Sequence, residues 1–121
     1  MNRRDRIILQ KILGYRSKVD GVHRFFQHDK VMFYDENEGF PYRDAMAMSV
    51  FQIGELSKSL SPEIRDAHAD IPWGNIIKMR EIFAHHYGEL NYDILWETSC
   101  DDVPALAGKI RLILEFEDGV R

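Results

Sequence analysis

Apolar side chains near the start of the chain recur at steps of three and four residues. Between Arg4 and about Phe26, the large apolar positions are Ile8, Ile12, Tyr15, Val19, Val22 and Phe26. This spacing places them on one stripe of an α-helix, because successive helical residues turn by about 100° around the axis. The sequence therefore predicts a long amphipathic helix over this segment.

A second long helix is predicted after a polar segment. Residues 35–41 gather acidic, amide, Gly and Pro residues without periodicity, which is typical of a loop. Pro41 suits the first turn of the following helix, which we expect to run to Ser61 and Pro62. Gly54 would allow a neighbouring helix to approach closely. The apolar stripe of this second helix consists of Met46, Val50, Ile53, Leu56 and Leu60.

The remaining helices are predicted from their start signals. Pro62 to Ala69 forms at most a short helical turn, and Pro72 begins the next helix. Asn91 is placed to cap a brief helix, and Asp101 or Asp102 to cap a last one. No alternating pattern typical of strands is present. The predicted fold is therefore all-α, an up-and-down four-helix bundle with one or two additional short helices.

The helix predicted between Trp73 and Gly88 carries one charged residue in its apolar stripe. The stripe consists of Trp73, Ile76, Arg80, Phe83 and Tyr87. A guanidinium does not lose its charge inside a protein, so Arg80 needs a partner. We expect Glu55 on the preceding helix to provide it; a solvent-facing glutamate is the alternative.

Arg80, His85 and Tyr87 together form the string R-x-x-x-x-H-x-Y. This string resembles the signature of HEPN domains, and more narrowly of the HepT-like toxins that are paired with minimal nucleotidyltransferase antitoxins. The chain departs from the family pattern at Glu81, where a small polar residue such as Asn is usual, and at His86, where Gly is common. Further segments resemble the same family, so the resemblance covers nearly the whole chain: Ile53-Gly54-Glu55, Ile71-Pro72-Trp73 and Leu95-Trp96.

The resemblance implies a single HEPN-like domain over residues 1–121 that acts as a metal-independent endoribonuclease toxin. In such a reaction a base takes the proton of the ribose 2′-hydroxyl, which attacks the adjacent phosphorus and leaves a 2′,3′-cyclic phosphate. Histidine suits proton transfer because its pKa lies near neutrality, and arginine suits the phosphate because its forked donors hold oxygens as charge builds. We expect Arg80 and His85 to be catalytic, with Glu55, Glu81 and His86 in supporting positions.

The positions of Arg80 and His85 on one helix raise a geometric problem. On an ideal helix they differ by about 140° in azimuth, so they do not share a face. Both residues could reach one phosphate if the helix loosened before His85, or if the long arginine side chain bent around the end of the helix. A two-fold interface is another solution, because Met79, Ile82 and His86 lie off the core stripe and predict burial against another surface. The resemblance likewise implies a homodimer whose paired arginines and histidines line one composite cleft.

Tyr87 lies within about 20° of Arg80 in azimuth. In HepT-like toxins the matching tyrosine is where the cognate nucleotidyltransferase antitoxin can attach adenylate, and the resemblance carries this AMPylation to Tyr87. A core aromatic residue on the helical stripe is the alternative interpretation.

A binding protein is the competing class of function. The chain would then be a non-catalytic nucleotide-binding or regulatory subunit of a nucleotidyltransferase complex, in which Arg80 holds a nucleotide phosphate or supports a dimer through Glu55. Glu81 favours this alternative, because a carboxylate beside the arginine would repel RNA and compete for the guanidinium.

The charge and hydropathy of the chain predict how it meets nucleic acid and where it is located. The net charge of −4 argues against nonspecific coating of nucleic acid, which depends on Lys and Arg. Residues 1–30 nevertheless carry eight Lys or Arg against three Asp, which predicts either a solvated helix face or a phosphate-facing rim for RNA. Because there is no apolar run of membrane-spanning length and no signal-like start, we expect a cytoplasmic protein.

The histidines and the cysteine give no sign of a metal centre in the sequence. His23 and His28 lie five residues apart in the sequence and do not share a face. Cys100, the single cysteine, excludes an internal disulfide and is expected to be structural. We therefore predict no metal site and no cofactor.

Overall fold

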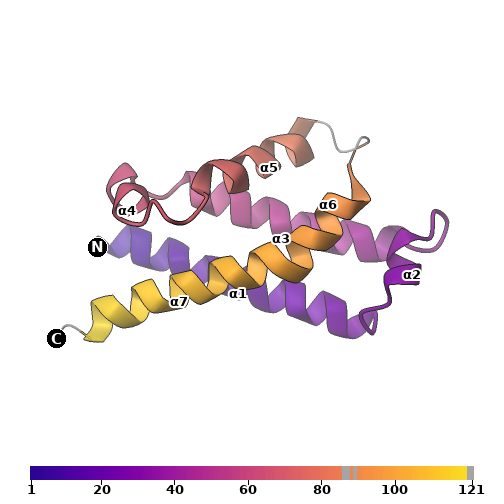
Figure 1. The fold of residues 1–121 in the computed structure, drawn as a ribbon, viewed down its shortest axis with the longest axis horizontal. Coiled ribbons are helices and arrows are strands. Elements are labelled where there is room, and N and C mark those ends of the chain that lie inside the picture. The colour runs from indigo at the N-terminus through magenta and orange to yellow at the C-terminus, as the bar shows by residue number, and fades with distance from the viewer. Residues whose placement is uncertain (86–87, 89, 120–121) are drawn as a thin grey trace.

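The computed structural model describes residues 1–85, 88 and 90–119, and over these ranges every regular element is helical (Figure 1). The prediction of an all-α bundle is confirmed. None of these helices is both long enough and apolar enough to cross a membrane. The elements are α1 (Arg3–Phe25), α2 (Lys30–Tyr34), α3 (Phe40–Lys58), α4 (Pro62–Ala67), α5 (Trp73–His85), α6 (Tyr92–Glu97), η2 (Thr98–Asp102) and α7 (Val103–Gly119).

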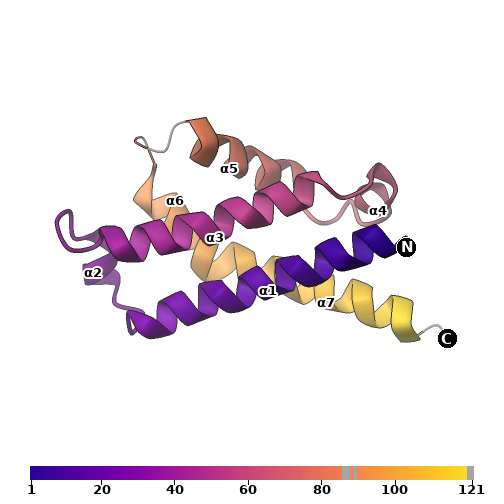
Figure 2. The same ribbon diagram turned by 180° about the vertical axis from the view of Figure 1, so that it is seen from behind.

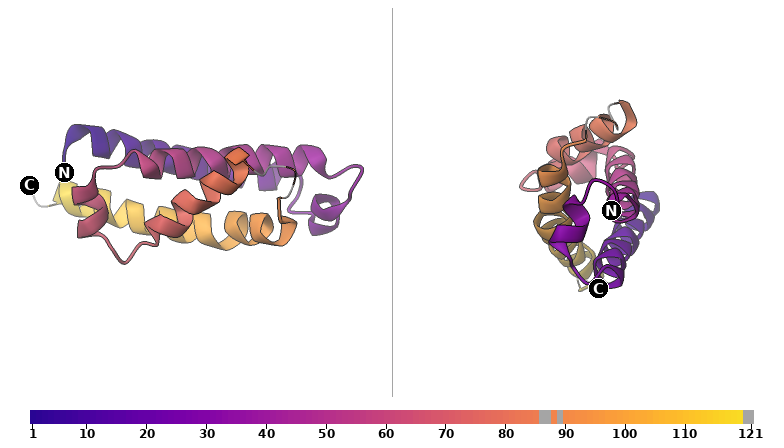
Figure 3. Two further views of the ribbon diagram at one scale, coloured as in Figure 1. Left: turned by 90° about the horizontal axis from the view of Figure 1, so that it is seen from above. Right: turned by 90° about the vertical axis from the view of Figure 1, so that its right-hand side faces the viewer.

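The helix α3 is the centre of the arrangement. It packs against α1 along one side and against α5 along the other, so that it separates these two helices (Figure 2). The helix α7 packs against α1, and the views from above and along the long axis show the helices running side by side (Figure 3). Fully buried side chains between them include Leu9, Ile12, Val19, Met46 and Ile110.

The stripes predicted for the long helices form this core. Ile12 and Val19 of α1 and Met46 of α3 are fully buried, as their spacing predicts. Burial of each such side chain contributes about 1.5–3 kcal/mol relative to an exposed position. The helix α5 packs on the side of α3 away from α1 and adds Trp73 and Phe83 to the core.

The structure contains one short helix, α2, that the sequence analysis does not predict. The helix α2 covers five residues that precede the predicted loop, and its N-cap Asp29 accepts a hydrogen bond from the backbone N–H of Met32 at 3.1 Å. A five-residue helix is too short to show a periodic apolar pattern. Its buried Phe33 packs in the core, and α3 then begins at Phe40 with Pro41 in its first turn, as predicted.

The connection from α6 to α7 differs from the prediction. Asn91 caps α6 as expected, since its side chain accepts from the backbone N–H of Ile94 at 3.1 Å. The predicted cap at Asp101 or Asp102 is wrong. The chain instead stays helical through η2, a π-helical turn over Thr98–Asp102, and enters α7 without a break. The extra residue of a π-turn is accommodated inside continuous helix, so no cap is needed.

Candidate active site on helix α5

The packing of α5 against α3 determines where Arg80 lies. At Gly54 of α3 the two helices come so close that an added Cβ would lie 2.5 Å from the Cβ of Arg80 and 3.2 Å from the carbonyl oxygen of Ile76. The expectation that Gly54 allows a close helix approach is therefore confirmed. The side chain of Arg80 projects from α5 at this contact point, next to the residue that follows Gly54 on α3.

That residue, Glu55, is the partner of Arg80. The Nε–H of Arg80 donates to Glu55 Oε1, and Nη1 donates to Glu81 Oε1 at 2.5 Å. These hydrogen bonds raise the pKa of the Arg80 guanidinium, and the bond that Arg80 donates to Glu55 has the largest effect. The predicted pairing of Glu55 with Arg80 is confirmed. The Arg80 side chain is 20% exposed and that of Glu81 is 45% exposed, so the group is reachable from solvent.

Lys58 adds a second cation to this group. Its Nζ lies 3.9 Å from Glu81 Oε1, at the end of α3. Arg80 and Lys58 therefore balance the charges of Glu55 and Glu81. A phosphate that approaches Arg80 has to replace at least one carboxylate oxygen as a hydrogen-bond acceptor, because charge-assisted bonds already occupy two sides of the guanidinium.

The helix α5 stays regular as far as His85. It does not loosen before that residue, so Arg80 and His85 remain about 140° apart around the axis. The side chain of His85, and His86 and Tyr87 altogether, lie outside the part of the chain that the structure describes. Ile82, predicted to lie on a second apolar side of α5, is 36% exposed.

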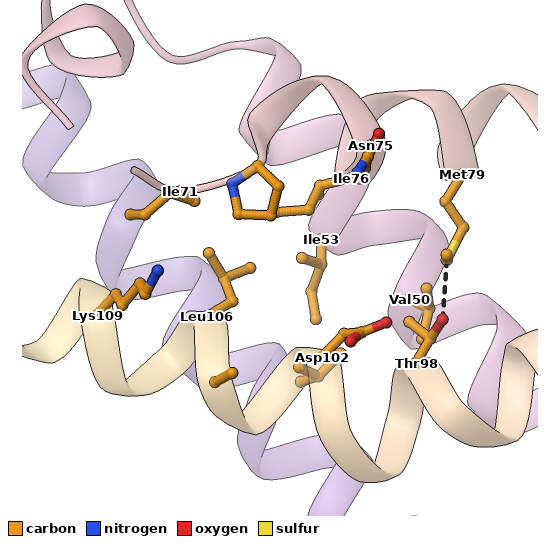
Figure 4. A pocket seen from close by; sticks show the side chains of 13 residues that line it. Val50, Ile53, Ile71, Asn75, Ile76, Met79, Thr98, Asp102, Leu106 and Lys109 are labelled. Carbon is orange, nitrogen blue, oxygen red and sulfur yellow. Dashed lines mark hydrogen bonds between the residues drawn. The ribbon is translucent and has the colours of Figure 1, made fainter. Parts of the chain in front are cut away.

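Met79, also predicted to lie off the core stripe, is partly buried within the chain itself. It lines an apolar cavity of about 290 Å³ between α3, α5 and the start of α7, and its sulfur accepts a hydrogen bond from Thr98 Oγ1 at 3.3 Å (Figure 4). Arg80 and Glu55 do not line this cavity. Its mostly apolar wall, with Val50, Ile53 and Leu106 in view, does not suit a polyanion such as RNA.

Within one chain α3 separates α1, which carries most of the basic N-terminal segment, from α5 (Figure 2). Two arginines of this segment form contacts with other residues of the same chain. Arg4 Nη1 donates to the carbonyl oxygen of Ser59 at 2.7 Å, and Arg16 forms an ion pair with Asp20 at 2.7 Å. These two positions therefore agree better with a structural helix face than with an RNA rim.

The structure brings together His23, His28 and Cys100, which the sequence analysis kept apart. The two histidines come together although they share no helix face, because α1 ends at Phe25, before His28. Gln27 and His28 then adopt left-handed backbone angles, with φ of 56° and 51°, which turn the chain back. The two imidazole rings lie 4.6 Å apart between centroids.

Cys100 reaches the same place from η2. Its Sγ lies 3.7 Å from His23 Nε2 and 4.0 Å from His28 Nε2. Burial lowers the pKa of His23 and raises the pKa of the Cys100 thiol, so both groups are neutral in this environment near neutral pH. No spacing signal in the sequence predicts this cluster, because it depends on a chain reversal and on contacts between distant elements.

Comparison with known proteins identifies relatives over most of the chain. The family model "Ribonuclease HepT-like" matches residues 15–113. A protein of Caldanaerobacter subterraneus subsp. tengcongensis named "Putative RNase" is 38% identical over 73 residues, which are 60% of this chain and 65% of that protein. A "Probable ribonuclease HepT" of Thermococcus cleftensis is 37% identical over 57 residues, which are 47% of this chain and 52% of that protein.

A longer but more distant match extends nearly from end to end. A "Putative RNase" of Methanocaldococcus jannaschii is 26% identical over 120 residues, which are 98% of this chain and 95% of that protein. The matched segments thus span less than two thirds of the first two relatives and nearly all of this third one. No solved structure gives a significant match.

Proposed function

Because the chain belongs to the HepT-like ribonuclease family, we propose that it is an endoribonuclease and the toxin of a type II toxin–antitoxin pair. The proposed reaction is metal-independent cleavage of RNA through Arg80 and His85 at a homodimer cleft. The proposed neutralising partner is a minimal nucleotidyltransferase antitoxin.

The contact between Arg80 and Glu55 carries this proposal. It holds the guanidinium in one orientation on a helix stripe while leaving part of it open to solvent. A pre-positioned cation of this kind stabilises negative charge that builds on a phosphate, because little reorganisation is needed during the reaction. A purely structural pair would gain nothing from remaining reachable.

The proposed reaction balances as an internal transfer at phosphorus. A base removes the proton from the ribose 2′-hydroxyl, the 2′-oxygen bonds to phosphorus, and the bond from phosphorus to the 5′-oxygen breaks. An acid returns a proton to that leaving oxygen, and the product is a 2′,3′-cyclic phosphate. His85 serves in proton transfer and Arg80 binds the phosphate oxygens.

A composite cleft follows from the straightness of α5. Because α5 continues as α-helix to His85, positions 80 and 85 are separated by about 140° in azimuth, which supports a cleft that takes its arginine and its histidine from different chains. Two copies related by a two-fold axis bring the arginine of one chain beside the histidine of its partner. The exposed Ile82 provides apolar surface on α5 for such an interface.

Neutralisation is proposed to act on Tyr87. An adenylate attached to its hydroxyl would bring a negative phosphate to the face of α5 that carries Arg80. The modified chain would then block RNA both by occupying the guanidinium and by filling the cleft.

A non-catalytic nucleotide-binding subunit is the second candidate, and one contact favours it. Glu81 takes a hydrogen bond from Arg80 and brings a second carboxylate to the guanidinium. RNA must compete with this carboxylate, whereas a single nucleotide phosphate bound by a regulatory subunit need not reach a catalytic geometry.

Incubation of the purified protein with RNA in EDTA tests the proposal. The expected result is cleavage with 2′,3′-cyclic phosphate ends, lost in Arg80→Ala and His85→Ala and retained in Lys78→Ala, which removes an exposed cation from the same helix. Circular dichroism checks that each variant keeps its helical content. Folded wild-type protein that binds a nucleotide but leaves RNA intact would support the second candidate instead.

A further inference from the structure

We propose that His23, His28 and Cys100 form a zinc site at the junction of the end of α1 with η2. The three side chains offer two imidazole nitrogens and one sulfur that all lie within 4.8 Å of one another. His23 is buried, Cys100 is half-buried and His28 is exposed. The proposal is independent of the ribonuclease function.

The distances between the donor atoms agree with tetrahedral coordination. With zinc about 2.3 Å from sulfur and about 2.0–2.1 Å from nitrogen, a tetrahedron has sulfur-to-nitrogen edges of about 3.6 Å. The observed separations from Cys100 Sγ are 3.7 Å to His23 Nε2 and 4.0 Å to His28 Nε2. The three donor atoms lie within 4.8 Å of one another, and the exposed His28 ring has to approach His23 until the two nitrogens are about 3.4 Å apart around an ion.

Neighbouring residues orient His23 as zinc-binding histidines are usually oriented. The hydroxyl of the fully buried Tyr42 is hydrogen-bonded to His23 Nδ1, which leaves Nε2 as the atom that faces Cys100. In the zinc-bound state Nδ1–H donates to Tyr42 Oη. The ring of Trp96 contacts both histidine rings, with centroids at 5.4 Å and 4.9 Å, and limits their rotation.

The same atoms also have a hydrogen-bonding arrangement without zinc. The Tyr42 hydroxyl then donates to His23 Nδ1, and His23 Nε2–H donates to Ser99 Oγ at 3.0 Å. Ser99 in turn donates to the carbonyl oxygen of Trp96 at 2.9 Å. Zinc uptake moves the imidazole proton from Nε2 to Nδ1, turns the Tyr42 hydroxyl from donor to acceptor, breaks the bond to Ser99 Oγ and releases the Cys100 thiol proton to solvent. These are local changes of protons and hydroxyl orientation, so the site does not have to unfold to take up an ion.

Two irregular pieces of backbone meet at this cluster. Left-handed backbone angles are uncommon for residues other than glycine, and here Gln27 and His28 adopt them in succession. The backbone N–H of His28 donates to the carbonyl oxygen of His23 at 2.7 Å. On the other side, Cys100 lies in the π-turn η2. Strained angles and π-turns concentrate at functional positions. Here both irregularities direct a ligand side chain to the same point.

Zinc is the ion that this donor set fits best, because it accepts both thiolate and imidazole ligands. The thiol proton of Cys100 leaves to solvent on binding, and solvent on the exposed side of His28 completes the fourth position. The site lies far from Arg80. Tyr42, beside the cluster, and Glu55, beside Arg80, are thirteen residues apart on α3, which corresponds to about 20 Å along the helix.

Titration of the reduced full chain with zinc, and with cobalt as a spectroscopic substitute, tests the site. We expect one ion per chain and a thiolate-to-cobalt charge-transfer band in the near ultraviolet. Because Cys100 is the single cysteine, that band reports its ligation directly. Zinc should also raise the midpoint of thermal unfolding, and EDTA should reverse the increase.

Substitutions complete the test. Cys100→Ser should remove the band and weaken zinc binding more than about 100-fold, and His28→Asn, which tolerates the left-handed backbone, should weaken it at least about tenfold. Tyr42→Phe should weaken it about 10–100-fold, and His68→Asn, a histidine on another element, should leave it unchanged. Absence of the band in the wild-type chain, or unchanged affinity in either Cys100→Ser or His28→Asn, would overturn the proposal.

Discussion

Gly54 on α3 and Arg80 on α5 are in direct backbone-to-side-chain contact, so close that an added Cβ at Gly54 would lie 2.5 Å from the Cβ of Arg80. The contact fixes the distance between the two helices at the point where Arg80 meets Glu55. The position of the candidate catalytic arginine thus depends on the absence of a side chain on the neighbouring helix.

Gly54→Ala should destabilise the protein although alanine favours helices. The new methyl group must push α5 outward, and overpacking of this kind costs about 1–3 kcal/mol, more than the gain of about 1 kcal/mol in helix propensity. Gly14→Ala is the matched control, because an added Cβ there meets no atom within 4 Å. Chemical denaturation should show a lower midpoint for Gly54→Ala and a higher one for Gly14→Ala. Equal stabilisation by both would contradict the close packing.

Glu81→Gln should increase cleavage of RNA. The substitution removes the negative charge of Glu81, which lies beside the Arg80 guanidinium, and keeps the size of the side chain. A phosphate then competes with one carboxylate fewer for Arg80. Since exposed charge pairs are weak, we expect a rise in kcat/KM of about two- to fivefold. Glu63→Gln, on α4, removes the same charge elsewhere and serves as control. A loss of activity in Glu81→Gln would instead give Glu81 a positive role in catalysis or in positioning Arg80.

Asp5→Ala should lower stability by about 1–3 kcal/mol, because it leaves buried donors without an acceptor. Asp5 is only 2% exposed, and its carboxylate accepts from the backbone N–H of Ser61 at 3.0 Å and from Ser61 Oγ at 2.5 Å. The contact ties the start of α1 to the start of α4. The exposed Asp66→Ala on α4 should change stability by less than about 0.5 kcal/mol. Thermal unfolding followed by circular dichroism compares the two, and similar small losses would contradict the anchoring role.

The long helices could be predicted because their cores follow the helical period. Ile12 and Val19 of α1 are buried where their spacing places them, and Asn91 caps α6 as its residue type suggests. The pairing of Glu55 with Arg80 could also be predicted from the sequence, because a charged residue in an apolar stripe requires a partner. These features depend on local sequence or on one simple requirement.

The other features depend on backbone geometry that no periodic pattern encodes. The π-turn over Thr98–Asp102 replaces the expected cap, since a continuous helix with one extra residue has no start signal. The left-handed angles at Gln27 and His28 arise without glycine, which is the usual sequence sign of such a reversal. The meeting of His23 with Cys100 follows from these two departures and from the tertiary packing.

Tyr87→Phe should leave the proposed ribonuclease active but allow it to escape neutralisation by modification. The substitution removes only the hydroxyl that would receive adenylate, so cleavage that depends on Arg80 and His85 should continue. Mass spectrometry after co-expression with a nucleotidyltransferase antitoxin should find adenylate-sized additions on the peptide that contains Tyr87. Tyr15→Phe, on α1, is the matched control and should still be neutralised. An unmodified Tyr87 in a fully neutralised complex would point to simple occlusion of the cleft.

Mixing two inactive variants tests whether the cleft is shared between chains. Arg80→Ala retains His85 and His85→Ala retains Arg80, so a mixed dimer contains one cleft with both groups if each chain contributes one of them. After subunit exchange at equal concentrations about half of the dimers are mixed, and we expect partial recovery of RNA cleavage. The control is each variant alone at the same total concentration, which should stay inactive.

A variant that weakens the proposed interface tests whether the recovered activity requires a dimer. Ile82 is 36% exposed on α5, and Ile82→Asp would place a charge in an apolar two-fold contact. Sedimentation should show a shift toward monomer, and the mixture of Arg80→Ala with His85→Ala should lose its recovered activity when both chains also carry Ile82→Asp. Lys78→Asp, an exposed position on the same helix, controls for the added charge. Full activity of a monomeric Ile82→Asp variant that keeps both Arg80 and His85 would mean that the two residues act within one chain.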